Sequence, residues 1–174
     1  MKLCATILVF VLATAAAPEI LVPIRPVLEA GSPAEASELR QAVDGKRMSV
    51  QAWGIVRKVR EVDVVLRANC ELSDRVREVH PEVCFYFMTG GHVLQFAKKR
   101  REGQQERCRV LRPHFGVAID EAIAALRSEK CTDDDILDAF AALWTAQRIV
   151  AGKATTVPTE PGRDRFGLRM EIVA

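Results

Sequence analysis

Several sequence features that would reveal a function directly are missing from this chain of 174 residues. The net charge is only +2, so the chain as a whole has no strong basic or acidic field. None of the five cysteines forms a Cys-x-x-Cys pair or has a histidine at zinc-ligand spacing. The three histidines have no Ser or Cys partner at a recognisable spacing, and there is no P-loop. A zinc site, a hydrolytic triad and a P-loop nucleotide site therefore have no support in the sequence.

The cysteines and the apolar N-terminus bear on the location of the protein. An odd number of cysteines at irregular spacing is typical of reduced thiols, which favours the cytoplasm. Residues 1–17 resemble a secretory signal instead, with one lysine, an apolar run and the small residues Ala-Thr-Ala at 13–15. The apolar run is too short for a membrane span. We predict a cytoplasmic protein without stable membrane association; the alternative is export, with residues 1–17 as a signal peptide.

The composition is that of a globular protein, with 49% hydrophobic and 28% charged residues. The length suffices for one domain with a core. We therefore expect an apolar leader or replaced N-terminus at residues 1–20 and a single domain at residues 21–174.

Capping residues, apolar periodicity and turn residues divide this domain into helices and strands. The predicted helices span residues 33–43, 49–66, 116–130 and 131–152. The predicted strands span residues 75–87, with a break at 80–82, and residues 168–173, and a loop is predicted around residues 158–162.

The clearest predicted helix, at residues 131–152, carries a dense group of carboxylates at its start. Thr132 is a suitable N-cap, with Asp135 three residues later. Negative side chains at this end stabilise the helix dipole, which accounts for Asp133 and Asp134 without any further function. Asp138 lies one turn further along and faces the same way as Asp135 or Asp134. Two carboxylates so placed would suit Mg²⁺ or Mn²⁺, so the pattern allows either a capped helix or a metal site.

A second local signal is the basic stretch at residues 98–112, which holds seven Lys or Arg residues against two Glu. It is either the solvated face of a helix and loop or a phosphate-contacting patch. The cations that open this stretch are Lys98, Lys99, Arg100 and Arg101.

Five stretches, taken together and in order, carry a family resemblance. They are SVQAWGIVRKVREVD (49–63), REVHPEVCFYFMTGG (77–91), the Lys-Lys pair at 98–99 followed by Arg-Glu-Gly, DDDILDAFAALWTAQRIVAG (133–152) and GLRMEIVA (167–174). From about residue 21 to the C-terminus, the chain resembles the bacterial family of unknown function described as predicted RNase H-like nucleases.

The resemblance implies an RNase H-like α/β fold, a mixed sheet flanked by helices. It also implies two divalent cations, Mg²⁺ or Mn²⁺, that support phosphodiester hydrolysis. Asp135 and Asp138 look like the last acidic motif of such a site, and Asp134 would be a further metal ligand. Glu78 looks like the middle acidic residue, with Glu82 as the alternative. Lys98 and Lys99, with Arg100 and Arg101, would contact nucleic-acid phosphates.

The sequence departs from the family pattern at its start. The family opens with a strand that ends in a Gly-Val-Asp-Gly-like motif, whereas here no acidic residue precedes Glu19. The resemblance therefore implies an N-terminally truncated domain that lacks its first catalytic aspartate. We expect a metal-dependent nuclease or its truncated remnant. The alternatives are an inactive member that binds nucleic acid or protein, and an exported protein of unknown function.

Overall fold

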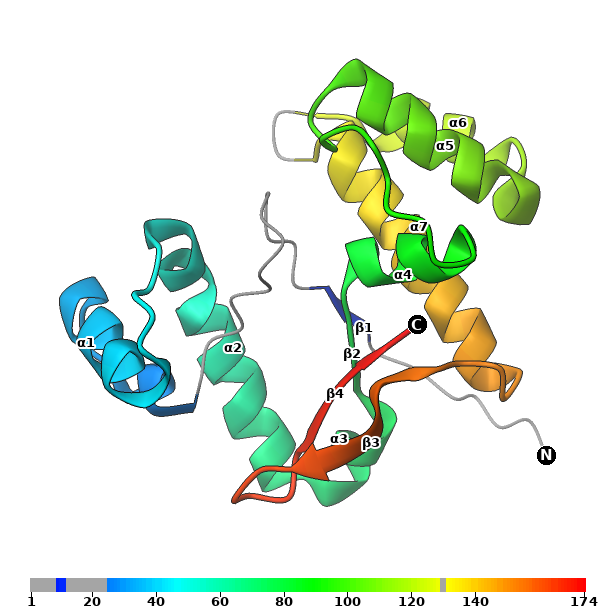
Figure 1. Cartoon of the computed structure of the whole chain (residues 1–174). Coiled ribbons are helices and arrows are strands. Elements are labelled where there is room, and N and C mark those ends of the chain that lie inside the picture. Colours follow the sequence, from blue (N-terminus) through cyan, green and yellow to red (C-terminus); the bar gives the residue numbers. More distant parts are fainter. Residues whose placement is uncertain (1–8, 12–24, 129–130) are drawn as a thin grey trace. The chain divides into compact units, whose positions relative to one another are not determined.

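The computed structural model describes residues 9–11, 25–128 and 131–174. These residues divide into two compact units (Figure 1). We call residues 25–73 the helical unit, and residues 9–11 together with 74–174 the main unit.

The helical unit consists of the 3₁₀ helix η1 (Arg25–Glu29), α1 (Pro33–Asp44) and α2 (Val50–Ala68). The Ser32 side chain caps α1 by accepting a hydrogen bond from the Glu35 backbone, and α1 ends at a left-handed glycine, as the sequence predicts. Ser49 caps α2 in the same way. The guanidinium of Arg60 donates to the carbonyls of residues 28 and 30, at 2.5 and 2.8 Å, and so ties η1 to α2. The core of this unit comprises Val27, Leu28, Ala30, Ala36 and Val56.

The main unit combines two short pairs of strands with helices. Its elements are β1 (Val9–Val11), β2 (Arg77–Val79), α4 (Pro81–Met88), α5 (Arg101–Phe115), α6 (Ala118–Leu126), α7 (Asp133–Val150), β3 (Thr156–Arg163) and β4 (Arg169–Val173); the short helix α3 (Cys70–Arg75) bridges the boundary with the helical unit. Strands β1 and β2 pair in parallel, with Phe10 opposite Glu78, and β3 pairs with β4 in antiparallel fashion. The expected α/β class is therefore confirmed, with the described strands in two separate two-stranded sheets.

Helix α7 forms the centre of the main unit, and α4, α5 and α6 all pack against it. Its buried face meets fully buried side chains from the other three helices. The largest of them are Phe85 on α4, Leu111 on α5 and Ile119 on α6, and α7 itself contributes Leu137. Burying one such side chain contributes about 1.5–3 kcal/mol, so α7 is held in place mainly by hydrophobic contacts.

The predicted strand at residues 83–87 is wrong, because this segment belongs to helix α4. Pro81 occupies the first turn, where its missing N–H is no loss, and the His80 carbonyl accepts the Cys84 N–H at 3.1 Å. Pro81, Cys84 and Phe85 share one face of the helix and are all buried. Tertiary burial of this helical face thus overrides the β-propensity of the aromatic and β-branched residues.

The predicted loop at residues 158–162 is also wrong, because it lies within strand β3. Pairing with β4 starts with Thr156 opposite Val173, and it resumes at Gly162 opposite Met170 after a shift in register. The two prolines fall between these paired segments. A proline cannot donate to a strand partner, and an irregular stretch of ladder accommodates it.

Most of the predicted leader lies outside the described residues. The part that is described, Val9–Val11, forms β1 and pairs with β2. Within the described ranges, no helix combines the length and the apolar character needed to cross a membrane.

Candidate functional site

The start of α7 is organised around Thr132. Its backbone N–H donates to Asp135 Oδ2 at 2.9 Å, and its hydroxyl lies 2.6 Å from the same oxygen and 2.7 Å from Asp134 Oδ1. These hydrogen bonds from Thr132 lower the pKa of Asp135 below its usual value. The side chain of Asp135 is exposed and serves the predicted capping box.

Asp138, one turn further along α7, has very different surroundings. It is 2% exposed, and its Oδ2 accepts a hydrogen bond from Lys98 Nζ at 2.7 Å. Its other oxygen, Oδ1, is buried and has no hydrogen-bond partner among the residues that the structure describes. Burial raises the pKa of Asp138, and the bond to the Lys98 ammonium opposes that rise. Asp138 is therefore a buried carboxyl group with one oxygen engaged and one oxygen unused.

Lys98 and Asp138 belong to a larger group of ionisable side chains, which we call the buried charge cluster: His80, Glu82, Lys98, Arg107 and Asp138. Arg107, 3% exposed, pairs with Glu82 through its Nη2 at 2.5 Å. Burial lowers the pKa of His80, so its neutral form is favoured. The remaining two cations and two carboxylates balance in charge, which limits the cost of burying Lys98, Arg107 and Asp138, and the Glu82 side chain is 42% exposed.

The backbone next to Lys98 is fixed by α5. Glu106 accepts hydrogen bonds from the backbone N–H groups of residues 95 and 96, at 3.0 and 3.1 Å. Arg107 donates to the Phe96 carbonyl at 3.2 Å. A Cβ atom on Gly103 would lie 2.2 Å from the Ala97 carbonyl oxygen, so the absence of a side chain there permits this close approach.

The sequence alone does not predict the contacts of these α5 residues with the segment before Lys98. Gly103, Glu106 and Arg107 recur at helical spacing and so share one face of α5. That spacing is visible in the sequence, but the segment that this face contacts is not.

Glu78 lies on strand β2, as predicted. Burial raises its pKa, and the nearby carboxylate of Glu171 raises it further. Glu171 is itself 7% exposed and accepts a hydrogen bond from Arg77 Nε at 2.7 Å. Glu78 therefore lies in a partly buried acidic environment between β2 and β4.

The four residues predicted as metal ligands thus fall into three separate local environments. Thr132 engages Asp134 and Asp135, Lys98 engages Asp138, and Glu171 is the charged neighbour of Glu78. In the parts of the chain that the structure describes, no group of three or more His, Cys, Asp or Glu residues is placed to hold a metal ion.

The predicted phosphate-binding residues separate into two kinds. Lys98 is directed inward to Asp138, with its side chain 12% exposed. Lys99, Arg100 and Arg101 are exposed at the start of α5.

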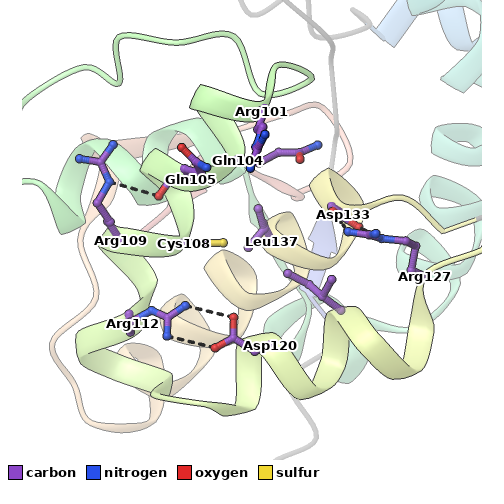
Figure 2. A pocket seen from close by; sticks show the side chains of 11 residues that line it. Arg101, Gln104, Gln105, Cys108, Arg109, Arg112, Asp120, Arg127, Asp133 and Leu137 are labelled. Atoms are coloured by element: carbon purple, nitrogen blue, oxygen red, sulfur yellow. Dashed lines mark hydrogen bonds and ion pairs between the residues drawn. The ribbon is translucent and has the colours of Figure 1, made fainter.

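An open pocket of about 550 Å³ lies between α5, α6 and the start of α7. Figure 2 shows Arg101, Arg109, Arg112 and Arg127 around it, with Cys108 and Leu137 between them. Two of these arginines are held by carboxylates: Arg112 pairs with Asp120, at 3.0 Å, and Arg127 pairs with Asp133 through two of its nitrogens.

The comparisons with known proteins give a family and no more. The family model described as "Protein of unknown function (DUF429)" matches residues 9–163, from β1 to the end of β3. Neither the curated proteins nor the solved structures contain a significant match. Because the matched region covers most of the chain and includes α4, α5 and α7 entirely, this protein belongs to the DUF429 family of proteins of unknown function.

Proposed function

We propose that the main unit is an RNase H-like nuclease domain that uses divalent cations, with Asp138 as its central acidic residue. The single observation that carries the proposal is the buried Asp138 carboxyl group, whose Oδ1 is unused among the described residues. Burying such a group lowers stability unless its hydrogen-bonding capacity is filled. Groups held in this way are concentrated at functional sites.

The proposed fold has support from the strands and from α7. An RNase H-like domain has a mixed sheet flanked by helices, and the main unit has a parallel and an antiparallel pair of strands beside its helices. Helix α7, which carries Asp138, lies against β1, and β1 pairs with the strand that carries Glu78.

The donor chemistry at Asp138 fits a hard divalent cation, because Mg²⁺ and Mn²⁺ prefer carboxylate oxygens. Asp138 Oδ1 would supply one ligand; Glu78, Asp134 and Asp135 are the proposed further ligands, and they would have to move toward Asp138, because the described residues do not hold them in one group. When bound, such cations activate a water and stabilise the leaving oxygen of a phosphodiester. The Lys98 ammonium pairs with Asp138 at 2.7 Å and opposes the rise in its pKa that burial causes.

A cleavage assay tests this proposal directly. Labelled single- and double-stranded DNA and RNA would be incubated with the full chain in Mg²⁺, Mn²⁺ or EDTA. We expect metal-dependent cleavage that falls at least about 100-fold in Asp138→Asn and in Glu78→Gln, as for loss of a group that stabilises a transition state. The exposed Glu38→Gln on α1 serves as the matched control and should cleave normally.

A thermal-shift measurement makes the test independent of the substrate. Mg²⁺ or Mn²⁺ should raise the Tm of the wild type and of Glu38→Gln, and should raise the Tm of Asp138→Asn by much less. A Tm that no metal changes, together with no cleavage of any substrate, would refute the proposal.

A second candidate is a domain that binds nucleic acid without cutting it. The exposed Lys99, Arg100 and Arg101 favour it, because a run of cations at a helix start can contact a phosphate backbone whether or not Asp138 holds a metal. This candidate predicts salt-sensitive binding with no cleavage in any of the metal conditions above.

A further inference from the structure

We infer that the arginine-lined pocket between α5, α6 and α7 binds the phosphates of a short single-stranded stretch of nucleic acid. The inference rests on the proposed function in one respect, namely that the polymer is nucleic acid. The pocket would be a second binding surface for that substrate, separate from the buried charge cluster.

The charge of the pocket favours an anion. Its lining contains four arginines and two aspartates, which leaves a net charge of +2. Arg101 and Arg109 form no ion pair within the described residues, and the hydrogen bond of Arg109 there, to the Gln105 carbonyl, is long at 3.4 Å. Their guanidinium groups therefore remain available for phosphate oxygens, which they can contact with two parallel hydrogen bonds.

The other two arginines are held in ion pairs and still have N–H donors that these pairs do not use. Arg112 engages Asp120 through its two terminal nitrogens, and Arg127 engages Asp133 through Nε and one terminal nitrogen. A guanidinium has five N–H donors, so each still has donors for a further acceptor. The aspartates thus fix the orientation of two arginines in advance, which lowers the entropy cost of binding.

The dimensions suit a strand better than an isolated anion. Arg101 and Arg109 are eight residues apart on α5, which corresponds to about 12 Å along the helix axis. Successive phosphates of one strand can contact both side chains at once, with each arginine in an extended conformation. The pocket is open, and its volume of about 550 Å³ is in the range of small-ligand sites, so it suits a short length of backbone.

The uncharged side chains that line the pocket indicate how strongly it would discriminate between base sequences. Its apolar lining consists of Cys108, Ile123 and Leu137, and its amide groups come from Gln104 and Gln105. The described residues that line it include no aromatic side chain on which a base could stack. Phosphate contacts should therefore dominate, with little preference for base sequence.

The pocket also neighbours the proposed acidic site. Leu137 lines the pocket, and the next residue, Asp138, belongs to the buried charge cluster. Consecutive helical residues point about 100° apart, so the two sites use adjacent faces of α7. A strand held by the arginines would be retained next to Asp138 without using that residue.

Fluorescence anisotropy with a labelled single-stranded oligonucleotide in EDTA tests the inference without any need for cleavage. The test variant is Arg101→Ala with Arg109→Ala. The matched control is Arg57→Ala with Lys58→Ala, which removes the same charge from exposed positions on α2 in the helical unit. We expect the test variant to bind at least about tenfold more weakly than the control.

The salt dependence gives a second readout. Loss of two phosphate contacts should reduce the slope of log K against log salt by about 1.4 for a single strand. Arg101→Lys with Arg109→Lys keeps the charge and should retain most of that slope. Equal binding and equal slopes for the test and control variants would overturn the inference.

A competition experiment distinguishes a pocket that binds a strand from one that binds a free anion. Inorganic phosphate or a mononucleotide should displace the oligonucleotide only at a far higher concentration of phosphate groups. If either competes equally well per phosphate, the pocket is a site for a small anion and the strand assignment is overturned. Binding that depends on Arg101 and Arg109, together with no cleavage of any substrate and a Tm that no metal changes, would refute the nuclease proposal alone. Cleavage that is insensitive to these arginines would refute the pocket alone.

Discussion

At the scale of single residues, the most consequential feature is the pairing of Lys98 with Asp138. The two residues are 40 positions apart in the chain and meet at 2.7 Å in a largely buried environment. Both residues can be singled out from the sequence, Asp138 by its place in α7 and Lys98 by its place in the basic stretch. Their pairing cannot be predicted from the sequence, because it depends on how α5 fixes the backbone before Lys98.

This pairing predicts that Lys98→Met will destabilise the protein. Removal of the ammonium leaves the Asp138 carboxylate buried without a cation, which costs about 3 kcal/mol. The double variant Lys98→Met with Asp138→Asn should recover most of that loss, because the uncompensated charge is gone. Urea unfolding of both variants measures the effect, with the exposed Lys99→Met as a control that should resemble the wild type. A single variant as stable as the wild type would contradict the prediction.

The raised pKa of Glu78 predicts that the stability of the protein depends on pH. This pKa is raised in the folded state by burial and by Glu171. A group of this kind contributes stability below its unfolded pKa of about 4.3, and that contribution is lost as the pH rises through the higher folded pKa. At neutral pH the wild type therefore carries an unfavourable charge that Glu78→Gln lacks.

We expect Glu78→Gln to have a Tm roughly 1–3 °C above that of the wild type at neutral pH. The difference should shrink as the pH falls toward about 4, where Glu78 is increasingly protonated in both states. Circular dichroism melts across this pH range measure it, and the exposed Glu38→Gln should show no such trend. A lower Tm for Glu78→Gln at neutral pH would mean that the carboxylate has a stabilising partner.

At the scale of elements, the starts of helices can be predicted from neighbouring residues, whereas the type of some other segments cannot. Ser32, Ser49 and Thr132 each mark a helix start that the structure confirms, because a cap depends only on residues next to it. Helix α4 and strand β3 were mispredicted, because burial against α7 decides the first and pairing with β4 decides the second. The partner of α4 lies far along the chain, whereas β4 follows β3 directly, so there the misleading signal was the two prolines and not the distance to the partner.

Gly103 provides a test of how closely α5 approaches the segment before it. A methyl group there would lie 2.2 Å from the Ala97 carbonyl oxygen, and backbone atoms cannot move aside cheaply. Gly103→Ala should therefore destabilise the protein by about 3 kcal/mol or more, because α5 must shift. It should also disturb Lys98, so metal-dependent stabilisation should fall with it.

Gly54→Ala in α2 is the matched control. No atom lies within 4 Å of its new Cβ, and the position is helical and exposed. Alanine has the higher helix propensity, so this variant should gain about 0.5–1 kcal/mol. Chemical unfolding of both variants measures the contrast, and equal effects of the two substitutions would contradict the close approach at Gly103.

At the scale of the whole molecule, the chain has two cores and one tryptophan beside each. Trp53 packs against the core of the helical unit, and Trp144 belongs to the core of the main unit. The sequence predicts a single domain at residues 21–174, since composition and length carry no sign of a division. The two tryptophans allow that prediction to be tested by unfolding.

We expect the two units to respond separately to core substitutions. Val56→Ala removes a fully buried side chain from the helical unit and should cost roughly 2 kcal/mol. In a Trp144→Phe background, the unfolding transition reported by Trp53 should move to lower denaturant. In a Trp53→Phe background, the transition reported by Trp144 should not move. A shift of equal size in both backgrounds would mean that the chain unfolds as one cooperative domain.

The parallel pairing of β1 with β2 sets an order of events during synthesis. Parallel strands need a crossover connection, and here that connection consists of residues 12–76, which include the helical unit. At typical translation rates, the ribosome needs roughly 3–13 s to make those 65 residues. The helical unit can therefore fold on the nascent chain while Val9–Val11 still has no strand partner. During that interval the apolar first strand is open to capture by a chaperone or by another nascent chain.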